Sequence, residues 1–249
     1  DDFDRMLAGM NERGLRLVLD LVVNHSSDEH EWFVQSRSSR DNPYRDHYVW
    51  RDGRDGGPPN NYPAFFGGSA WEYDEGTDQW YLHYFAVKQP DLNWEHPPVR
   101  REVYDIMKFW LDKGVAGFRM DVIPFISKQP GLPDLEGEQR FRPQYVYASG
   151  PRVHEFLHEM HTEVLGPYDA VSIGEAFGVE VADIATITAA AHEAGAYVVV
   201  EKILEGDEPL PRTWRTAGTT GRHLVPRAGI VISAHSSFND QCGVRTRVW

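Results

Sequence analysis

Two acidic residues and one arginine stand at the ends of apolar stretches, where they could carry out acid–base or nucleophilic chemistry. Arg119 and Asp121 end the apolar stretch 115–122, and Glu175 comes at the end of the stretch 170–176. Residues at i and i+2 of a strand point to the same face, so the guanidinium of Arg119 lies beside the carboxylate of Asp121 and favours its ionised form. A structural ion pair at a strand end is the alternative that these two residues leave open.

Glu175 has different neighbours, because Gly174 and Ala176 flank it and no cation is near it in the sequence. A carboxyl group in apolar surroundings near another carboxylate tends to stay protonated, which suits a general acid. If the two strands are neighbours, about 4.8 Å apart, the carboxyl groups fall near the roughly 5–5.5 Å separation of retaining glycoside hydrolases. A strand-end or helix-capping glutamate is the alternative reading.

The elements that must position these residues follow a repeated pattern of helix and strand. An amphipathic helix precedes a nearly continuous apolar strand three times, and two weaker strands follow further along the chain. The predicted helices begin near Phe3, Pro97 and Pro151, and the five predicted strands end near His25, Val122, Ala176 and Leu204 or lie around Ile230. This alternation predicts an α/β fold with a parallel sheet, either a barrel or a doubly wound stack. Five strands cannot close an eight-stranded barrel.

The first three strands carry polar residues at their carboxyl ends. Asn24 and His25 end the first strand, Arg119 and Asp121 the second, and Glu175 the third. In parallel α/β folds this edge of the sheet is where ligands bind and chemistry takes place. Polar residues at the ends of three strands indicate a ligand-binding or active site better than they indicate chance composition.

The connection between the first two strands is unusually long. Residues 26–89 are rich in Gly, Pro, Asn and aromatic side chains. A connection of this length is uncommon unless it is functional or a small domain of its own. We expect an inserted subdomain whose aromatic residues mainly form its core, while one or two could stack on a ligand.

Composition excludes several classes of protein. The 249 residues carry a formal charge of −13, which disfavours nucleic acid as a partner, and the single cysteine, Cys242, fits a reducing, cytoplasmic compartment. No apolar run approaches the roughly 20 residues that span a bilayer, and we expect no leader peptide because no charged-then-apolar segment is found at the start. The first residue is Asp1 rather than Met, which suggests a fragment. We expect no membrane partner, and the oligomeric state stays open.

Four stretches of the sequence resemble the motifs of a known family. In order and spacing, LDLVVNHSSDEHEWF, QPDLNWEHP, GFRMDVI and SIGEAF resemble the motifs of the α-amylase family of glycoside hydrolases, especially its oligo-1,6-glucosidase and α-glucosidase branch. The resemblance implies a partial (β/α)8 TIM barrel with a subdomain inserted after the third barrel strand. Residues 1–25 and 90–249 would form the incomplete catalytic barrel, and residues 26–89 the inserted subdomain.

The resemblance also implies roles for individual residues. Asp121 would be the nucleophile, Glu175 the acid/base, and Arg119 the residue that orients Asp121. His25 would bind the sugar by a hydrogen bond, whereas Asp20 would support the local geometry.

Further features of the family match this chain less completely. In the family, a Val at the position of Val122 goes with a preference for α-1,6 over α-1,4 bonds. Asp240, in SSFNDQ, is the candidate for the third catalytic acid, although the expected His beside it is missing. The first two barrel strands are absent, and with them the loop that binds calcium in many members. We therefore expect no metal site and no cofactor.

The resulting hypothesis is a retaining exo-α-glucosidase that acts on short α-linked gluco-oligosaccharides. A transglucosylase or sucrose isomerase of the same family is the alternative within the chemistry, because these enzymes share the nucleophile and the acid/base. A catalytically inactive fragment or binding homologue is the alternative from another class.

Overall fold

The computed structural model describes residues 2–148, 150–178 and 198–201 of the chain. In this part of the chain the main sheet has the order β1-β5-β6-β7, and every neighbouring pair is parallel. Its strands are β1 (Val18–Val22), β5 (Gly117–Asp121), β6 (Val171–Glu175) and β7 (Val198–Glu201). Four of the five predicted strands are thus confirmed. The fifth, around Ile230, lies outside the described residues, as does Asp240.

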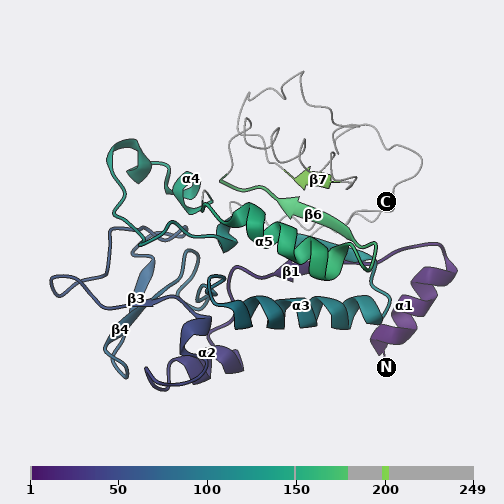
Figure 1. Cartoon of the computed structure of the whole chain (residues 1–249), viewed down its shortest axis with the longest axis horizontal. Coiled ribbons are helices and arrows are strands. Elements are labelled where there is room, and N and C mark those ends of the chain that lie inside the picture. Colours follow the sequence, from purple (N-terminus) through teal and green to yellow (C-terminus); the bar gives the residue numbers. More distant parts are fainter. Residues whose placement is uncertain (1, 149, 179–197, 202–249) are drawn as a thin grey trace, which may run out of the picture.

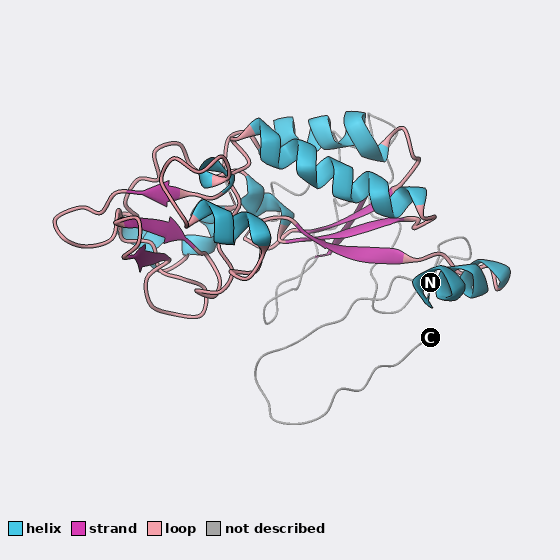
Figure 2. Ribbon diagram, turned by 90° about the horizontal axis from the view of Figure 1, so that it is seen from below, coloured by secondary structure: helices cyan, strands magenta, loops and turns pink. Residues whose placement is uncertain are grey.

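The helices alternate with the strands as predicted. They are α1 (Asp2–Glu12), α3 (Pro97–Asp112) and α5 (Val153–Met160), which continues as the π-helical turn η4 (His161–Leu165). Pro97 and Pro98 occupy the first turn of α3, where a missing N–H is tolerated. Helices α3 and α5 lie side by side over one face of the main sheet (Figures 1 and 2). The α/β fold follows from this arrangement.

Helix α1 packs less closely than its periodicity predicts. Phe3, Met6, Leu7 and Met10 share a face of the helix, but only Leu7 is buried and Met6 is 47% exposed. Figure 2 shows α1 beyond the end of the main sheet rather than over its face.

The main core lies between the sheet and the two covering helices. Phe118 of β5, Met107 of α3, and Phe156 and Val164 from α5 and η4 are fully buried there. Gly117 allows β5 and β6 to approach, because a Cβ at this position would lie 1.9 Å from the carbonyl oxygen of Val171. The core therefore fixes the spacing of the strands whose ends carry the acidic residues.

A second, antiparallel sheet has the order β2-β4-β3 and lies at the end toward which β6 points (Figure 1). Its strands are β2 (Trp50–Arg51), β3 (Trp71–Asp74) and β4 (Gln79–Leu82). The remaining short elements are α2 (Glu31–Ser36), η1 (Arg45–His47), η2 (Ile123–Ile126), η3 (Gly137–Arg140) and α4 (Pro143–Tyr147).

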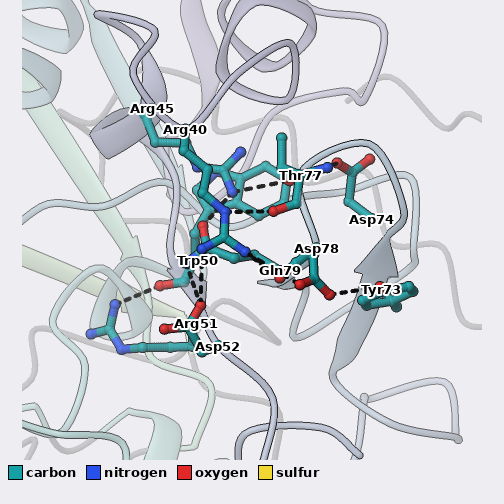
Figure 3. Close-up of polar contacts among 10 residues, drawn as sticks. All are labelled: Arg40, Arg45, Trp50, Arg51, Asp52, Tyr73, Asp74, Thr77, Asp78 and Gln79. Carbon is teal, nitrogen blue, oxygen red and sulfur yellow. Dashed lines mark hydrogen bonds and ion pairs between the residues drawn. The ribbon is translucent and has the colours of Figure 1, made fainter. Parts of the chain in front are cut away.

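Two arginines join the second sheet to the segment that precedes it (Figure 3). Arg40 donates to the carbonyl oxygens of Thr77 and Asp78 in the β3–β4 turn. Arg45 donates to Oγ1 of Thr77 and Oε1 of Gln79, and its guanidinium lies over the ring of Trp50. Burial lowers the pKa of Arg45 to about 10.

A second core joins residues 26–89 to the connection between β5 and α5. Tyr84 stacks on Tyr147 of α4 with ring centroids 3.9 Å apart, and the buried Phe125 of η2 lies against Tyr84. Trp50 belongs to the main core and Trp71 to the second one. Half of the aromatic residues of 26–89 are buried, and they lie in cores that they share with the rest of the chain. Within the described residues, no helix is long and apolar enough to cross a membrane.

Candidate active site

The ends of β1, β5 and β6 bring the predicted polar residues to one edge of the main sheet. β5 pairs with β1 through Arg119 opposite Asp20, and with β6 through Met120 opposite Gly174. Asp121 and Glu175 are the next residues of these two neighbouring strands. The strand adjacency that the sequence argument assumed is thus confirmed.

Arg119 contacts three carboxylates at this edge. Its Nη1 lies 2.8 Å from Oδ1 of Asp121 and 3.0 Å from Oδ1 of Asp20, and its Nη2 lies 2.9 Å from Oε2 of Glu175. Burial works to lower the pKa of Arg119, but the hydrogen bonds with Asp20 and Asp121 and the charge of Glu175 outweigh it. The pKa therefore lies above its ordinary value, and the guanidinium is a permanent cation.

The surroundings of Glu175 differ from the apolar setting that its sequence neighbours suggest. Its Oε2 contacts Arg119 and also accepts a hydrogen bond of 3.0 Å from the backbone N–H of Val122. The expectation of a carboxyl group without a nearby cation is therefore wrong. The reason is physical: the cation comes from the adjacent strand, and residues next to Glu175 in the sequence give no sign of it.

Val122 occupies an unusual backbone conformation. Its φ of 37° and ψ of 41° lie in the left-handed region, where a β-branched residue is rare. Its side chain is buried, and its N–H is the group that reaches Glu175. The turn after β5 is thus strained at Val122, the residue whose N–H links this turn to Glu175 of β6.

His25 follows β1 and faces the same site. It lines a groove of about 600 Å³ together with Asp121 and Gln89. Nε2 of His25 lies 3.0 Å from Nε2 of Gln89, and Nδ1 lies 3.4 Å from Nδ2 of Asn24. Burial lowers the pKa of His25, although the charges of Asp91 and Asp121 partly oppose it. The ring is therefore neutral near pH 7.

Three polar residues of the site were not identified from the sequence. Gln89 and Asp91 belong to the QPDLN stretch. This stretch is part of the family resemblance, but no role was predicted for either residue. Lys128 follows η2, and its ammonium pairs with the fully buried Asp91 at 3.0 Å. A lysine outside helices and strands is normally a solvated surface residue, so the sequence gives no indication that Lys128 is buried.

Exposed aromatic rings stand next to His25. Phe85 lies 5.2 Å from His25 between ring centroids and 5.7 Å from Phe65. Phe65 and Phe66 are 54% and 62% exposed, unlike the buried aromatic residues of the two cores. These exposed rings contact each other and Phe85, and they are candidates for stacking on a ligand, as the sequence suggested for one or two aromatic residues of 26–89.

Metal binding finds no support in the described part of the chain. No group of three or more His, Cys, Asp or Glu side chains there could hold a metal ion. The acidic residues at the strand ends instead have a guanidinium as their cation.

Comparison with known proteins fits this geometry. Residues 1–199 match the catalytic domain of the α-amylase family. The chain belongs to the α-amylase family. It is 61% identical to the oligo-1,6-glucosidase of Parageobacillus thermoglucosidasius over 181 residues, which are 72% of this chain and 32% of that protein. It is also 51% identical to the trehalose-6-phosphate hydrolase of Bacillus subtilis, over 70% of this chain and 31% of that protein.

Solved structures give the same family. The trehalulose synthase MutB from Pseudomonas mesoacidophila MX-45 superimposes with a TM-score of 0.73 at 56% identity, over 74% of this α-amylase family chain and 33% of that one. An isomaltulose synthase mutant from Erwinia rhapontici NX5, in complex with D-glucose, gives a TM-score of 0.73 at 52% identity, with the same coverage. The chain thus spans about a third of the length of these relatives.

Proposed function

We propose that this chain is part of a retaining exo-α-glucosidase that hydrolyses short α-linked gluco-oligosaccharides, with α-1,6 bonds as the main substrate. The observation that carries the proposal is the contact of one guanidinium, that of Arg119, with both Asp121 and Glu175 at the ends of neighbouring strands. The similarity to oligo-1,6-glucosidases supports the substrate class.

In the proposed mechanism Asp121 attacks the anomeric carbon of the terminal glucose and forms a glucosyl ester. Glu175 gives a proton to the oxygen of the leaving sugar, and later takes a proton from the water that hydrolyses the ester. Arg119 orients Asp121 for the attack and contacts Glu175 as well.

The remaining roles complete the proposed site. His25, as a neutral ring beside Asp121, would bind a hydroxyl group of the glucose, and Val122 would favour α-1,6 bonds through the shape of the turn that it occupies. Asp240, outside the described residues, is proposed as the third acid that stabilises the oxocarbenium-like state.

The proposal extends to the architecture. Residues 1–25 and 90–249 would be part of a (β/α)8 barrel. Residues 26–89, which contain the second sheet, would be the subdomain inserted after the third strand of the barrel. We further propose a cytoplasmic location and a small oligosaccharide as the substrate, with neither nucleic acid nor membrane involved and the oligomeric state open. The net charge of −13 and the single cysteine support this.

A sucrose isomerase is the second candidate function. The solved structures that support it include a MutB mutant in complex with the substrate sucrose, at 56% identity to this chain. Product analysis of the complete protein on sucrose and isomaltose separates the candidates. Free glucose supports the hydrolase, and a rearranged disaccharide supports the isomerase.

The deciding experiment replaces Asp121→Asn in the complete protein that carries this chain. We expect loss of glucose release from p-nitrophenyl α-glucoside by roughly 10³-fold or more, since the amide cannot form the ester. Asp105→Asn, on the exposed side of α3, is the matched control and should retain full activity. Mass spectrometry should find a mechanism-based fluoroglucoside bound at Asp121. Wild-type turnover by the Asp121→Asn variant would refute the proposed nucleophile.

A further inference from the structure

A buried lysine connects three segments that meet behind the candidate site. The side chain of Lys128 is 9% exposed, and its Nζ lies 3.0 Å from Oδ1 of Asn24, 2.9 Å from the carbonyl oxygen of Phe125 and 3.0 Å from Oδ2 of Asp91. The first two contacts are hydrogen bonds donated by the ammonium group, and the third is an ion pair with a buried carboxylate. The contacts reach the loop after β1, the QPDLN stretch and η2.

The ion pair between Lys128 and Asp91 is not explained by stability. Both side chains lie out of water, and Asp91 is fully buried. Removing two charges from water is costly, and well-packed apolar residues in place of such a pair are often as stabilising or more so. The fold alone therefore does not need an ammonium at this position.

The ammonium does determine the orientation of the Asn24 amide. A lysine only donates hydrogen bonds, so the atom of Asn24 that faces Lys128 must be the oxygen. The amide nitrogen of Asn24 then faces Nδ1 of His25 at 3.4 Å. Asn24 itself is fully buried, which leaves its amide no water to turn toward.

A second amide faces the other nitrogen of the His25 ring. The Oε1 of Gln89 accepts a hydrogen bond of 3.1 Å from the backbone N–H of Ala86, so its Nε2 is the atom that lies 3.0 Å from Nε2 of His25. Both nitrogens of His25 thus face donor groups. An imidazolium would direct an N–H at both of these donors and a neutral ring would direct one at only a single donor, so this arrangement disfavours the imidazolium.

The geometry points to Lys128 as a positioning residue: by holding the amide oxygen of Asn24, it directs the amide nitrogen of Asn24 at Nδ1 of His25 and keeps the ring in one orientation beside Asp121. The inference rests on the proposed function in one respect, which is that His25 binds the sugar. Lys128 itself touches no reacting atom.

The charged groups that face His25 are Asp91, Asp121 and Lys128. Burial lowers the pKa of His25 most, Lys128 lowers it further, and the two aspartates raise it. Asp91 and Lys128 therefore act in opposite directions on His25. Removal of both leaves the net charge facing the ring unchanged, but it also removes the acceptor of the Tyr84 backbone N–H and the donor to the Phe125 carbonyl oxygen.

The first test is Asn24→Asp in the complete protein, which keeps the shape of the side chain and the contact with Lys128. The new carboxylate presents an oxygen to Nδ1 of His25, which favours the protonated ring. Titration of the ¹⁵N-labelled histidine ring, assigned by its loss in His25→Gln, should show protonation at a pH about one unit or more above wild type. The acid limb of the kcat/KM profile should move by the same amount. An unchanged His25 titration overturns the inference.

The second test is the double variant Lys128→Met and Asp91→Leu, which replaces the ion pair by apolar residues. A purely structural role predicts a lower melting temperature, with ring signals and kcat/KM of the folded protein near wild type. The positioning role predicts that the folded variant shows a His25 ring signal averaged over two tautomers and a loss in kcat/KM of roughly tenfold or more. Wild-type ring signals and kcat/KM in a folded double variant overturn the inference. If this variant does not fold, Asn24→Asp, which retains the ion pair, decides.

The ring titration needs no turnover, so it separates this inference from the proposed function. Absence of both hydrolysis and labelling at Asp121 would refute the function and leave the His25 measurement valid. Labelling at Asp121 together with an unchanged ring in Asn24→Asp would refute the role of Lys128 alone.

Discussion

The backbone N–H of Val122 donates a hydrogen bond of 3.0 Å to Oε2 of Glu175. This bond joins the residue after the proposed nucleophile to the proposed acid/base on the neighbouring strand. It forms while Val122 is in the left-handed region, at a φ of 37°. That conformation costs an L-residue with a Cβ about 1–2 kcal/mol. The hydrogen bond that it allows fixes the position of Glu175 relative to the residue after Asp121.

Replacement of Val122 tests this strain. Glycine adopts the left-handed region freely, so Val122→Gly should be at least as stable as Val122→Ala, although it removes one more buried carbon. Val115 is equally buried and has no left-handed backbone, so there the order should be the ordinary one, with Val115→Gly less stable than Val115→Ala by about 1 kcal/mol. Urea unfolding of the four variants gives the comparison. The same order at both positions would contradict the strain.

Arg119→Lys should impair activity without unfolding the protein. A lysine is a compact point charge and cannot present two separate nitrogens to Asp121 and Glu175 as a guanidinium does. We expect kcat to fall roughly 10²-fold while the melting temperature changes little. Arg101→Lys, on the exposed side of α3, is the control and should retain kcat. Steady-state kinetics and a thermal melt measure both quantities, and wild-type kcat in Arg119→Lys would refute the bridging role.

Gly117→Ala should destabilise the main sheet. Its new Cβ would lie 1.9 Å from the carbonyl oxygen of Val171 on β6, so the two strands would have to separate. We expect a loss in the free energy of unfolding of about 3 kcal/mol. Gly57→Ala is the control, because its nearest atom would be 3.7 Å away. Equal unfolding midpoints for the two variants would show that β5 and β6 are not held this closely.

Stability should fall as the pH drops below about 6.5, the ordinary pKa of histidine. Burial lowers the pKa of His83, and a contact with the carbonyl of Phe85 only partly opposes this. The unfolded chain then binds a proton that the folded chain does not, so the stabilisation present above pH 6.5 is lost as the pH falls toward the folded pKa. The melting temperature of His83→Asn should depend less on pH between 7.5 and about 5. Exposed His154→Asn should keep the wild-type slope, and equal slopes for all three proteins would contradict this account.

The sequence predicts the helix–strand order well because the strands are short apolar runs and the helices carry apolar residues at helical spacing. The apolar run of residues 115–122 contains β5, and the prolines at 97 and 98 mark the start of α3. The same signal misjudges α1, where Met6 lies on the apolar face of the helix yet is half exposed. Periodicity indicates which residues share a face, but it does not show whether another element covers that face.

The sequence predicted which residues of the candidate site stand at the ends of individual strands. Asp121, Arg119, Glu175 and His25 come to one edge because strand ends meet there. Contacts between strands were not predictable: the guanidinium of Arg119 reaches Glu175 across the sheet, and this changes the charge expected around that carboxyl group. Lys128 was missed for a related reason, since its burial depends on Asp91, a residue distant in the sequence.

The stacking of Tyr84 on Tyr147 has a practical consequence for protein engineering. Exchange of residues 26–89 between related enzymes, as in loop grafting to alter substrate range, would cut through this shared aromatic packing. A chimera should therefore carry the donor's residues 123–148 together with the donor's 26–89. These two stretches, separate in the gene, share one aromatic core and should be exchanged together.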